Sequence, residues 1–443
     1  MSIDTLVIAL AGGEGKRLMP LTIERAKSAV PFGGRYRLID ITLSNVVNSD
    51  LRQIYVLTQY KSQSLCDHLI DSWTIANQPE LGQFLSAMPA QKRGSEDWYG
   101  GTADAVRQNF KYVVEKWNPN NMLIVSTDHV YKMDYRQMIA YHFGKGADVT
   151  VATTKIRRED AANRFGVIEV DDNFRIIGFE EKPAEPKPIP GNSEHCLINM
   201  GVYYFKTPTL GEAFNADTNP NLDFGKHVIP SLKDTKAVFA YPFPELNKIP
   251  GYRDSRDSNG MLFKEKIERT PDSSYWSDVG EPFSLWLAHM DLISEIPLFD
   301  LYNTRWPIHS GHTTSPPLKT DRDAQGNEGY LIRSLAGEGS IVSGGRVEKS
   351  VLFQNVFVDG AKIEESIIMD NVYIGKGAEL RRVISDKSVR IHPGVRLGYD
   401  PELDNQYLKS MCRQYPQRMP NELMQISSEG IITIPKGVEI KKI

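Results

Sequence analysis

Hydrophobic and polar positions divide the chain into two parts with different rhythms. In the first part, up to about Glu295, short apolar runs alternate with amphipathic stretches, which is typical of an α/β domain. Apolar residues recur at helical spacing between Ala103 and Trp117, so this stretch is predicted to be a helix that packs on the sheet. Four apolar runs are predicted to be buried strands: Leu6 to Leu10, Gln53 to Leu57, Met122 to Val125 and Val149 to Ala152.

The second part, from Ile341, loses the helical period. Aliphatic residues return there at intervals of five or six, with Gly, Asp, Asn and Ser between them, which predicts the stacked coils of a parallel β-helix. A β-sandwich is the alternative, but its strands would show a period of two with turns every ~8 to 12 residues. The residues expected to face inward are Ile341, Val347, Leu352, Val358, Ile363, Ile368, Ile374 and Leu380.

These rhythms predict three segments: an α/β domain over 1–295, a proline-bearing linker over 296–338, and a β-helix over 339–443. Two polar stretches interrupt the first domain, 183–191 and 247–274. Both contain proline and few apolar residues, so they are expected to be surface loops or mobile flaps.

Composition narrows the functional class. A net charge of −4 over 443 residues argues against general capture of nucleic acid or of an anionic membrane, so small molecules are the expected partners. The three cysteines lack CxxC spacing, which predicts neither a disulfide framework nor a zinc site and fits a reducing cytoplasm. With no signal-peptide pattern and no apolar run near ~20 residues, the protein is expected to be soluble and cytoplasmic.

The first predicted strand runs into the glycine-rich segment AGGEGKRLMPLT, which begins at Ala11. Gly12, Gly13 and Gly15 would let the backbone approach a phosphate and present N–H groups to it, while Arg17 and Lys27 would add positive charge. The spacing matches neither a Walker A loop nor a dinucleotide fingerprint. A purely structural turn uses the same glycines, so the nearby cations carry the phosphate interpretation.

Two carboxylates follow apolar segments. Asp128 comes directly after the run that ends at Val125, and ligands of open α/β sheets bind at the carboxyl ends of strands. Asp278 lies in YWSDVG, and the two carboxylates are predicted to share Mg²⁺ against phosphate oxygens. The alternative for Asp128 is a cap on a helix beginning at His129.

A third cluster, FEEKPAEP, offers Lys182 for an anionic substrate, or as a solvated charge at a loop edge. Cations and a carboxylate-held metal supply what nucleotidyl transfer needs, because a sugar phosphate oxygen attacks the α-phosphorus of a nucleoside triphosphate and pyrophosphate leaves. The residues therefore favour a sugar-nucleotide pyrophosphorylase.

The motifs together resemble the glucose-1-phosphate adenylyltransferase family of bacterial glycogen synthesis. The blocks occur in family order over most of residues 6–397: AGGEGKRLMPLT, RAKSAVPFGGRYRLIDITLSN, PAQKR, DWYGGTADAV, TDHVYKMDY, EEKPAEP, LDFGKHVIP and WSDVG. The resemblance implies a Rossmann-like nucleotidyltransferase domain followed by a left-handed parallel β-helix for oligomerisation and regulation. It also implies a homotetramer, small-molecule allosteric effectors, the cofactor Mg²⁺, and the substrates ATP and α-D-glucose 1-phosphate.

The resemblance further assigns roles by position. It implies catalytic roles for Arg17, Lys27 and Asp128, and metal binding by Asp128 and Asp278. The implied nucleotide-binding residues are Gly12, Gly13, Gly15, Gln59, Trp98, Tyr99 and Gly101. The implied glucose 1-phosphate-binding residues are Tyr99, Gly166, Glu181, Lys182, Asn199, Asp223, Phe224 and Trp276.

Four positions depart from the family pattern. Ser28 replaces a proline, Thr127 stands where glycine is common, and Asn199 stands where a serine often lines the sugar site. Glu24 occupies the place where activator-regulated relatives carry a lysine for a sugar bisphosphate. These changes put the fine contacts of the sugar pocket and the regulation in question.

Three alternatives remain open. A UDP-, GDP- or dTDP-sugar pyrophosphorylase would share the glycine turn and both aspartates, and a non-catalytic regulatory subunit would bind effectors without turnover. A β-helix acyltransferase would need a histidine within a coil, and His392, the only histidine after His312, is expected on the β-helix surface.

Overall fold

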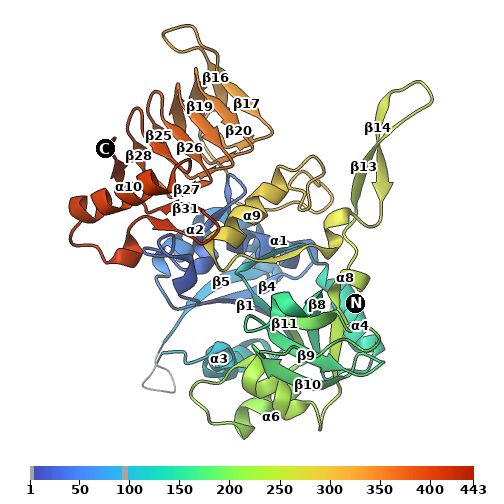
Figure 1. Cartoon of the computed structure of the whole chain (residues 1–443). Helices are drawn as coiled ribbons and strands as arrows, with labels where there is room; N and C mark the ends of the chain where they lie inside the picture. Colours follow the sequence, from blue (N-terminus) through green and yellow to red (C-terminus); the bar gives the residue numbers. More distant parts are fainter. Residues whose placement is uncertain (1–3, 92–97) are drawn as a thin grey trace.

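The computed structural model describes residues 4–91 and 98–443. An α/β domain forms one end of the molecule and a β-helix the other (Figure 1). Across the described residues, no helix combines the length and the apolar character that a membrane crossing requires.

A mixed sheet forms the centre of the first domain and, within the described residues, has nine strands. Seven follow the order β10-β9-β11-β6-β1-β4-β5, while β8 pairs with β11 and β12 pairs with β8. Strands β6, β1, β4 and β5 run parallel, and β11 is antiparallel to β6. The four predicted strands are confirmed. The bounds are β1 Thr5–Ala11, β4 Gln53–Thr58, β5 Phe84–Pro89, β6 Asn121–Ser126, β8 Val149–Arg157, β9 Gly166–Val170, β10 Ile176–Glu181, β11 His195–Lys206 and β12 Val238–Pro242.

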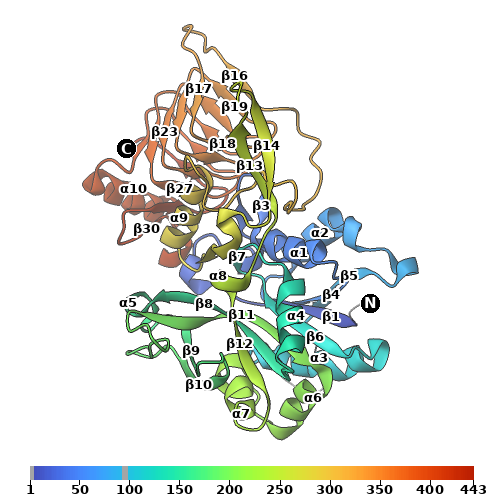
Figure 2. The ribbon, with the colours of Figure 1, turned by 90° about the vertical axis from the view of Figure 1, so that its right-hand side faces the viewer.

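Helices cover both faces of this sheet (Figures 1 and 2). Side chains alternate across a strand, so Leu6 and Ile8 of β1 join the core beneath one helix layer and Val7 and Ala9 join the core beneath the other. The first layer contains α3 (Thr102–Trp117), α6 (Thr207–Ala216) and α7 (Ile229–Leu232). The second contains α1 (Leu38–Asn48), α2 (Gln63–Ser72) and α4 (Tyr135–Gly144). Helix α3 confirms the predicted helix.

The second domain is a left-handed parallel β-helix whose sides are three sheets of short strands, all within described residues. The central coils are offset by 16 or 17 residues, as in the pairing of Ile341 with Phe357 and of Tyr373 with Arg390. One sheet contains β16 Lys319–Asp321, β19 Ile341–Ser343, β22 Phe357–Asp359, β25 Tyr373–Ile374, β28 Arg390–Ile391 and β32 Glu439–Ile440.

The two other sides are built in the same way. The second sheet contains β17 Tyr330–Ile332, β20 Arg346–Glu348, β23 Lys362–Glu364, β26 Glu379–Arg381 and β29 Arg396–Leu397. The third contains β18 Leu335–Ala336, β21 Val351–Leu352, β24 Ile367–Ile368, β27 Val383–Ser385, β31 Ile432–Ile434 and β30 Gln425–Ile426. The helix α10 (Pro401–Gln414) leaves the coils between β29 and β30.

Two details differ from the sequence prediction. Val342, rather than Ile341, is the fully buried residue of its strand, so Ile341 lies on the outer face. The first coil already begins with β16 at Lys319, inside the segment expected to be a linker. That strand has the sequence KTD, which offers no aliphatic residue to reveal it.

The segment 247–274 was expected to be a surface loop or mobile flap; its place on the surface is confirmed, but a loop conformation throughout is wrong. It forms a β-hairpin of β13 (Gly251–Arg256) and β14 (Leu262–Ile267) that projects from the body of the protein (Figure 1). Opposite charges face each other across its strands, with Arg253 paired to Glu265 and Asp254 to Lys264. The hairpin alternates charges instead of apolar residues, so the hydrophobic pattern does not reveal it. The other stretch, 183–191, contains no helix or strand.

The two domains share an apolar core. Leu18, Phe32 and Leu285 of the first domain cluster with Phe353 and Ile384 of the β-helix. Leu285 belongs to α9 (Pro282–Leu292), which lies beside the coils in both views (Figures 1 and 2). The segment that carries Lys27 is therefore anchored close to the β-helix. Shorter helices and strands that complete the first domain include β2 Pro31–Phe32, β3 Tyr36–Arg37, α5 Arg158–Ala161 and α8 Phe243–Leu246.

Candidate functional site

A cavity of about 280 Å³ opens at the carboxyl ends of β1, β4 and β6. Its walls come from the glycine-rich loop after β1, the start of α3, and the segment after β6. The residues that line it are Leu10, Gly12, Gly13, Lys27, Ser28, Leu57, Gln59, Tyr99, Gly100, Gly101, Thr102, Ala105, Ser126 and Asp128. The predicted phosphate loop and the predicted metal-binding carboxylate thus face one space.

The three glycines of the loop differ in what they do. A side chain on Gly13 would meet nothing within 4 Å, so its backbone is open to a ligand, whereas one on Gly12 would lie 3.3 Å from Gln59. Gly15 has φ +68, and a Cβ there would press on Lys27 and Thr22 at 3.0 Å. Gly15 is absent from the cavity lining. It shapes the loop that supports Lys27, and the ligand-facing backbone is that of Gly12 and Gly13.

Lys27 links the two predicted metal-binding carboxylates. Its side chain is 9% exposed, and its Nζ donates to Asp128 Oδ2 at 2.9 Å and to Asp278 Oδ1 at 3.2 Å. Asp278 ends β15 (Trp276–Asp278), which pairs antiparallel with β7 (His129–Tyr131) and places Asp278 opposite His129. This strand pairing brings together carboxylates that are remote in sequence. The helix cap considered for Asp128 is excluded because a strand follows it.

The charges of this cluster reinforce one another. Burial alone would lower the pKa of Lys27, but the carboxylates of Asp128 and Asp278 outweigh it and raise the pKa above its usual value. Burial alone would raise the pKa of Asp128, but Lys27 and then His129 hold it well below its usual range. Lys27 is therefore cationic and Asp128 anionic at neutral pH.

The two carboxylates suit a hard divalent cation. Their oxygens Asp128 Oδ2 and Asp278 Oδ1 converge on one positive centre, the Lys27 ammonium, which marks where a cation is stabilised. Through residues 4–91 and 98–443, no group of three or more His, Cys, Asp or Glu is arranged to hold a metal. A pair of carboxylates that leaves other positions to water and phosphate oxygens is the arrangement Mg²⁺ prefers.

Arg17 lies at the rim, outside the cavity lining. Its side chain is 59% exposed, its Nη1 donates to Glu281 Oε1 at 2.9 Å, and its Nη2 lies 3.9 Å from Asp278 Oδ2. Exposed pairs of this kind are worth at most ~1 kcal/mol, so the guanidinium is free to turn toward a phosphate. Sequence reasoning missed Glu281, the first residue after WSDVG and the N-cap of α9.

Three of the residues implied in nucleotide binding meet at the mouth of the cavity. Gln59 Oε1 accepts the backbone N–H of Tyr99 at 3.0 Å, and Tyr99 Oη accepts from Asn109 Nδ2 at 2.8 Å. Gly101 caps α3, and a Cβ there would lie 2.3 Å from the carbonyl of Leu222. This close approach explains why glycine is needed at that position.

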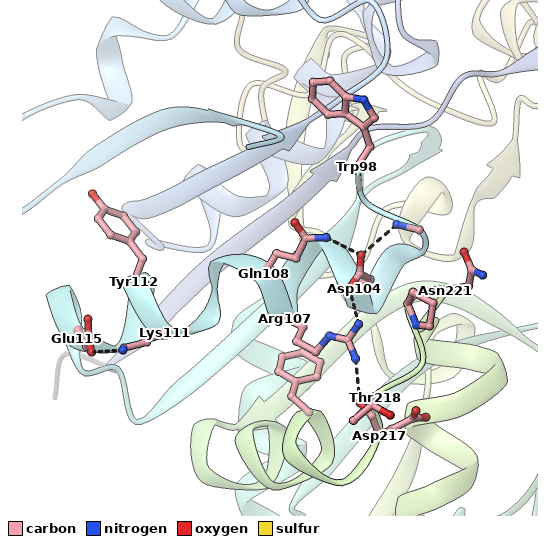
Figure 3. A pocket seen from close by; sticks show the side chains of 13 residues that line it. Trp98, Asp104, Arg107, Gln108, Lys111, Tyr112, Glu115, Asp217, Thr218 and Asn221 are labelled. Atoms are coloured by element: carbon pink, nitrogen blue, oxygen red, sulfur yellow. Dashed lines mark hydrogen bonds and ion pairs between the residues drawn. The ribbon is translucent and has the colours of Figure 1, made fainter. Parts of the chain in front are cut away.

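Trp98 lies apart from the other residues assigned to the nucleotide. Its side chain is 59% exposed, and it lines a separate groove on the outer side of α3 (Figure 3). Lys92 and Arg93 of the PAQKR motif lie outside the described residues.

The residues implied in glucose 1-phosphate binding are called the sugar side below, and those implied in nucleotide binding the nucleotide side. On the sugar side, Asp223 connects two elements. Its Oδ1 accepts the backbone N–H groups of Gly225 and Lys226, and its Oδ2 accepts from Thr102 Oγ1 at 2.8 Å. Phe224 is fully buried and stacks on Tyr203, with ring centroids 4.9 Å apart. Phe224 therefore supports the wall from within the core, and its side chain is not open to a ligand.

Glu181 and Lys182 follow the same edge of the sheet. Gly166 pairs with Glu181 across β9 and β10, and a Cβ on Gly166 would lie 2.6 Å from the Phe179 ring. Lys182 is exposed, has φ 51, and donates its backbone N–H to Phe165. Burial, reinforced by Asp223, raises the pKa of Glu181. Lys182 is thus an exposed cation beside the carboxylate of Glu181.

Asn199 and Trp276 complete the implied sugar pocket. Asn199 lies at an irregularity of β11, where its Nδ2 donates to Tyr203 Oη at 2.7 Å and its Oδ1 accepts from Gly201 at 2.9 Å. The Trp276 ring lies 5.0 Å from His129 and buries an indole N–H that has no hydrogen-bond partner in the part of the chain that the structure describes.

Two supporting residues escaped sequence reasoning. Ser126 Oγ donates to Asp128 Oδ1 at 2.7 Å, and Thr102 joins Asp223 as described above. Ser126 lies within the STDHVY motif and could have been found from it. Thr102 contacts a partner more than a hundred positions away, and the sequence carries no signal for that contact.

Comparison with known proteins agrees with this geometry. The Nucleotidyl transferase family matches residues 6–295, and the GlmU-like, C-terminal hexapeptide family matches residues 316–412. A glucose-1-phosphate adenylyltransferase 1 of Vibrio parahaemolyticus is 42% identical over 439 residues, covering 98% of both chains. A glucose-1-phosphate adenylyltransferase of Rhodopirellula baltica is 41% identical over 411 residues, covering 91% of this chain and 87% of its own.

These matches span both domains and include the segments that hold Lys27, Asp128 and Asp278. They confirm the fold class, the family and the nucleotidyltransferase activity that the motifs predict. The chain belongs to the glucose-1-phosphate adenylyltransferase family.

Proposed function

We propose that the protein joins the AMP part of ATP to α-D-glucose 1-phosphate, forming ADP-glucose and releasing pyrophosphate. The observation that carries this proposal is the cluster of Lys27, Asp128 and Asp278, which borders the cavity between the nucleotide side and the sugar side. Family membership supplies the two substrates. ADP-glucose formed in this way would supply α-glucan (glycogen) synthesis.

In the proposed reaction, a phosphate oxygen of glucose 1-phosphate forms a bond to the α-phosphorus of ATP. The bond from that phosphorus to the oxygen of the β-phosphate breaks, and pyrophosphate leaves. The backbone of Gly12 and Gly13 borders the triphosphate, Lys27 neutralises charge on the reacting phosphate, and Arg17 turns in from the rim toward the leaving group. Lys182 meets the phosphate of the sugar substrate as a point charge.

The carboxylates of Asp128 and Asp278 are proposed to hold Mg²⁺, whose charge offsets that of the triphosphate when the ion is bound. With those carboxylates engaged by the ion, Lys27 would be free to reach the phosphates. The convergence of two carboxylate oxygens on one cation supports this assignment.

A regulatory assembly is also proposed. Phe357 and Tyr373 form a stacked aromatic pair on the outer face of the β-helix, with ring centroids 5.8 Å apart and each side chain 37% exposed. Ile341 extends the same ladder. An exposed apolar stripe of this kind suits contact with another copy, in keeping with the homotetramer proposed here. We place the small-molecule effectors on the surface where the two domains meet, beside Glu24, Arg418 and Lys436, which surround a hollow of about 10 Å³.

A non-catalytic regulatory subunit is the second candidate, and the intact Lys27, Asp128 and Asp278 cluster argues against it. An acyltransferase has less support, because His392 is 40% exposed on the coils and pairs with Glu439.

The test is to incubate the purified protein with ATP, glucose 1-phosphate and Mg²⁺ and to follow ADP-glucose and pyrophosphate together. Equal amounts of both products, abolished by a chelator, are expected. Pyrophosphate without ADP-glucose, or binding without turnover, would contradict the proposal.

A further inference from the structure

Helix α3 begins without a side chain that caps it. Its N-cap is Gly101, which has no side chain, so the first backbone N–H groups of the helix need partners elsewhere. The carbonyl of Leu222 accepts two of them, from Ala103 at 3.1 Å and from Asp104 at 2.9 Å. Leu222, the residue before Asp223, therefore caps the start of α3, just after the nucleotide-binding residues Tyr99 and Gly101.

Asp104 holds the other side of this junction. Its side chain is 4% exposed, and its Oδ2 accepts the backbone N–H of Gly100 at 3.0 Å and Gln108 Nε2 at 2.8 Å. Gly100 follows Tyr99 and lines the cavity. Asp104 thus fixes the backbone on which the nucleotide side is built.

Arg107 connects Asp104 to the sugar side (Figure 3). Its Nη2 donates to Asp104 Oδ1 at 2.6 Å and to the carbonyl of Asn219 at 2.8 Å, while its Nη1 donates to the carbonyl of Asp217 at 2.8 Å. The planar guanidinium serves all three acceptors at once, which a lysine ammonium on a flexible stem cannot reproduce.

The 217–221 segment follows directly on α6 and leads into Asp223 and Phe224, and among the described residues its hydrogen bonds to α3 come from Arg107. Asp223 donates its backbone N–H to His227 Nδ1 at 3.0 Å, and the same ring contacts the amide of Asn219 at 3.2 Å. A shift of Asn219 would therefore be passed to Asp223. The carbonyl of Pro220 also lies so close to Gly100 that a Cβ there would approach it to 2.3 Å.

We propose that Arg107 is a positioning residue for the sugar substrate: by joining Asp104 to the carbonyls of Asp217 and Asn219, it holds the segment 217–224 against the start of α3. The inference rests on the proposed function. The hydrogen bonds of Asp104 with Gly100 and Gln108 do not depend on Arg107. Loss of Arg107 should therefore loosen the sugar side and leave the nucleotide side in place.

The experiment compares Arg107→Gln and Arg107→Lys with the wild type, and uses Lys111→Gln as the matched control. Lys111 lies one turn further along α3 and lines the same groove (Figure 3). Within the described residues, its ammonium pairs with exposed Glu115 at 3.7 Å. The KM for each substrate and kcat are measured in the direction of ADP-glucose synthesis, together with the Tm with and without glucose 1-phosphate.

Arg107→Gln is expected to raise the KM for glucose 1-phosphate about tenfold, because charge-assisted hydrogen bonds to two carbonyls are lost, and to leave the KM for ATP within about twofold. Arg107→Lys should recover part of the loss, and Lys111→Gln should match the wild type. The gain in Tm on adding glucose 1-phosphate should shrink in Arg107→Gln only.

Equal rises in both KM values, or an unchanged KM for glucose 1-phosphate, would overturn the inference. A lower Tm without ligand, accompanied by no selective change in either KM, would also overturn it by showing a structural role alone. If the wild type itself fails to turn over this substrate pair, the proposed function fails, and the inference that rests on it fails too.

Discussion

Ser28 and Thr127, two positions where the chain departs from the family pattern, are hydrogen-bonded to each other. Ser28 Oγ and Thr127 Oγ1 lie 2.7 Å apart, and Thr127 Oγ1 also donates to the carbonyl of Leu10 at 2.8 Å. Since the single Thr127 hydroxyl hydrogen is used on Leu10, Ser28 must donate to Thr127. The pair lies directly beside the Lys27 to Asp128 contact, so each departure supplies the partner that the other needs.

We therefore expect these two residues to be coupled. Thr127→Val should destabilise more than Ser28→Ala, because it leaves both the Ser28 hydroxyl and the Leu10 carbonyl without a partner. The double variant should be about 1 kcal/mol more stable than the sum of the single effects predicts. Free energies of unfolding from urea titrations of the four proteins measure this coupling, and additive effects would contradict it.

Asp128→Asn should lower kcat by about 10² or more, because the lost negative charge is worth several kcal/mol at the cation site. Asparagine has the same shape and can still accept from Ser126, so folding should be preserved. Steady-state kinetics and thermal unfolding check both statements. Asp148→Asn is the control, since Asp148 pairs with Lys206 away from the cavity and should retain turnover. Near-normal kcat in Asp128→Asn would remove Asp128 from the mechanism.

The sequence predicts the regular parts of this fold well, for a physical reason. Strands buried on both faces, helix α3 and the stacked coils each repeat an apolar residue at a fixed interval, and that interval is visible in the chain. The hairpin of β13 and β14 repeats charges instead, and the first coil begins with KTD, so neither shows an apolar period.

The site is predictable where it depends on local motifs. Asp128, Asp278 and Lys27 each stand in a recognisable segment, and the structure brings them together. Contacts such as Arg17 with Glu281, or Ser28 with Thr127, depend on how remote segments meet. A motif can also suggest a contact that its side chain does not offer: the motif of Phe224 matches the sugar pocket, but its ring is part of the core.

Glu24 offers a test of the proposed effector position between the domains. Its Oε2 accepts from Lys436 Nζ at 2.6 Å, so it neutralises a lysine of the β-helix instead of standing alone in a polar turn. Glu24→Lys would leave Lys436 unpaired and add a second cation beside it, and should strengthen activation by fructose 1,6-bisphosphate by about fivefold in affinity.

Effector titrations of the wild type, Glu24→Gln and Glu24→Lys decide this question. The neutral variant is expected to fall between the other two. Strong activation of the wild type that neither substitution changes would show that Glu24 takes no part in effector choice.

His289 should make stability depend on pH. It is fully buried, Nδ1 contacts the carbonyl of Leu285 at 2.8 Å, and Nε2 accepts the backbone N–H of Gly33 at 3.2 Å, so the ring is neutral. Burial lowers its pKa to about 4, whereas the unfolded chain takes up that proton near pH 6.5. Between these values the unfolded state binds more protons, so stability falls as the pH drops, by up to about 3 kcal/mol.

The free energy of unfolding, measured from pH 7.5 to 4, should therefore fall less steeply in His289→Gln than in the wild type. His312→Gln, a change at an exposed histidine, is the control and should keep the wild-type slope. Parallel curves for His289→Gln and the wild type would show that His289 does not control the pH dependence.

The most direct test of the account is pyrophosphate release measured over a matrix of ATP, UTP, GTP and dTTP against the 1-phosphates of glucose, galactose and mannose. The account predicts that ATP with glucose 1-phosphate gives the highest kcat/KM, by about tenfold or more over any other pair. Preference for another nucleotide or another sugar would contradict the proposed substrates.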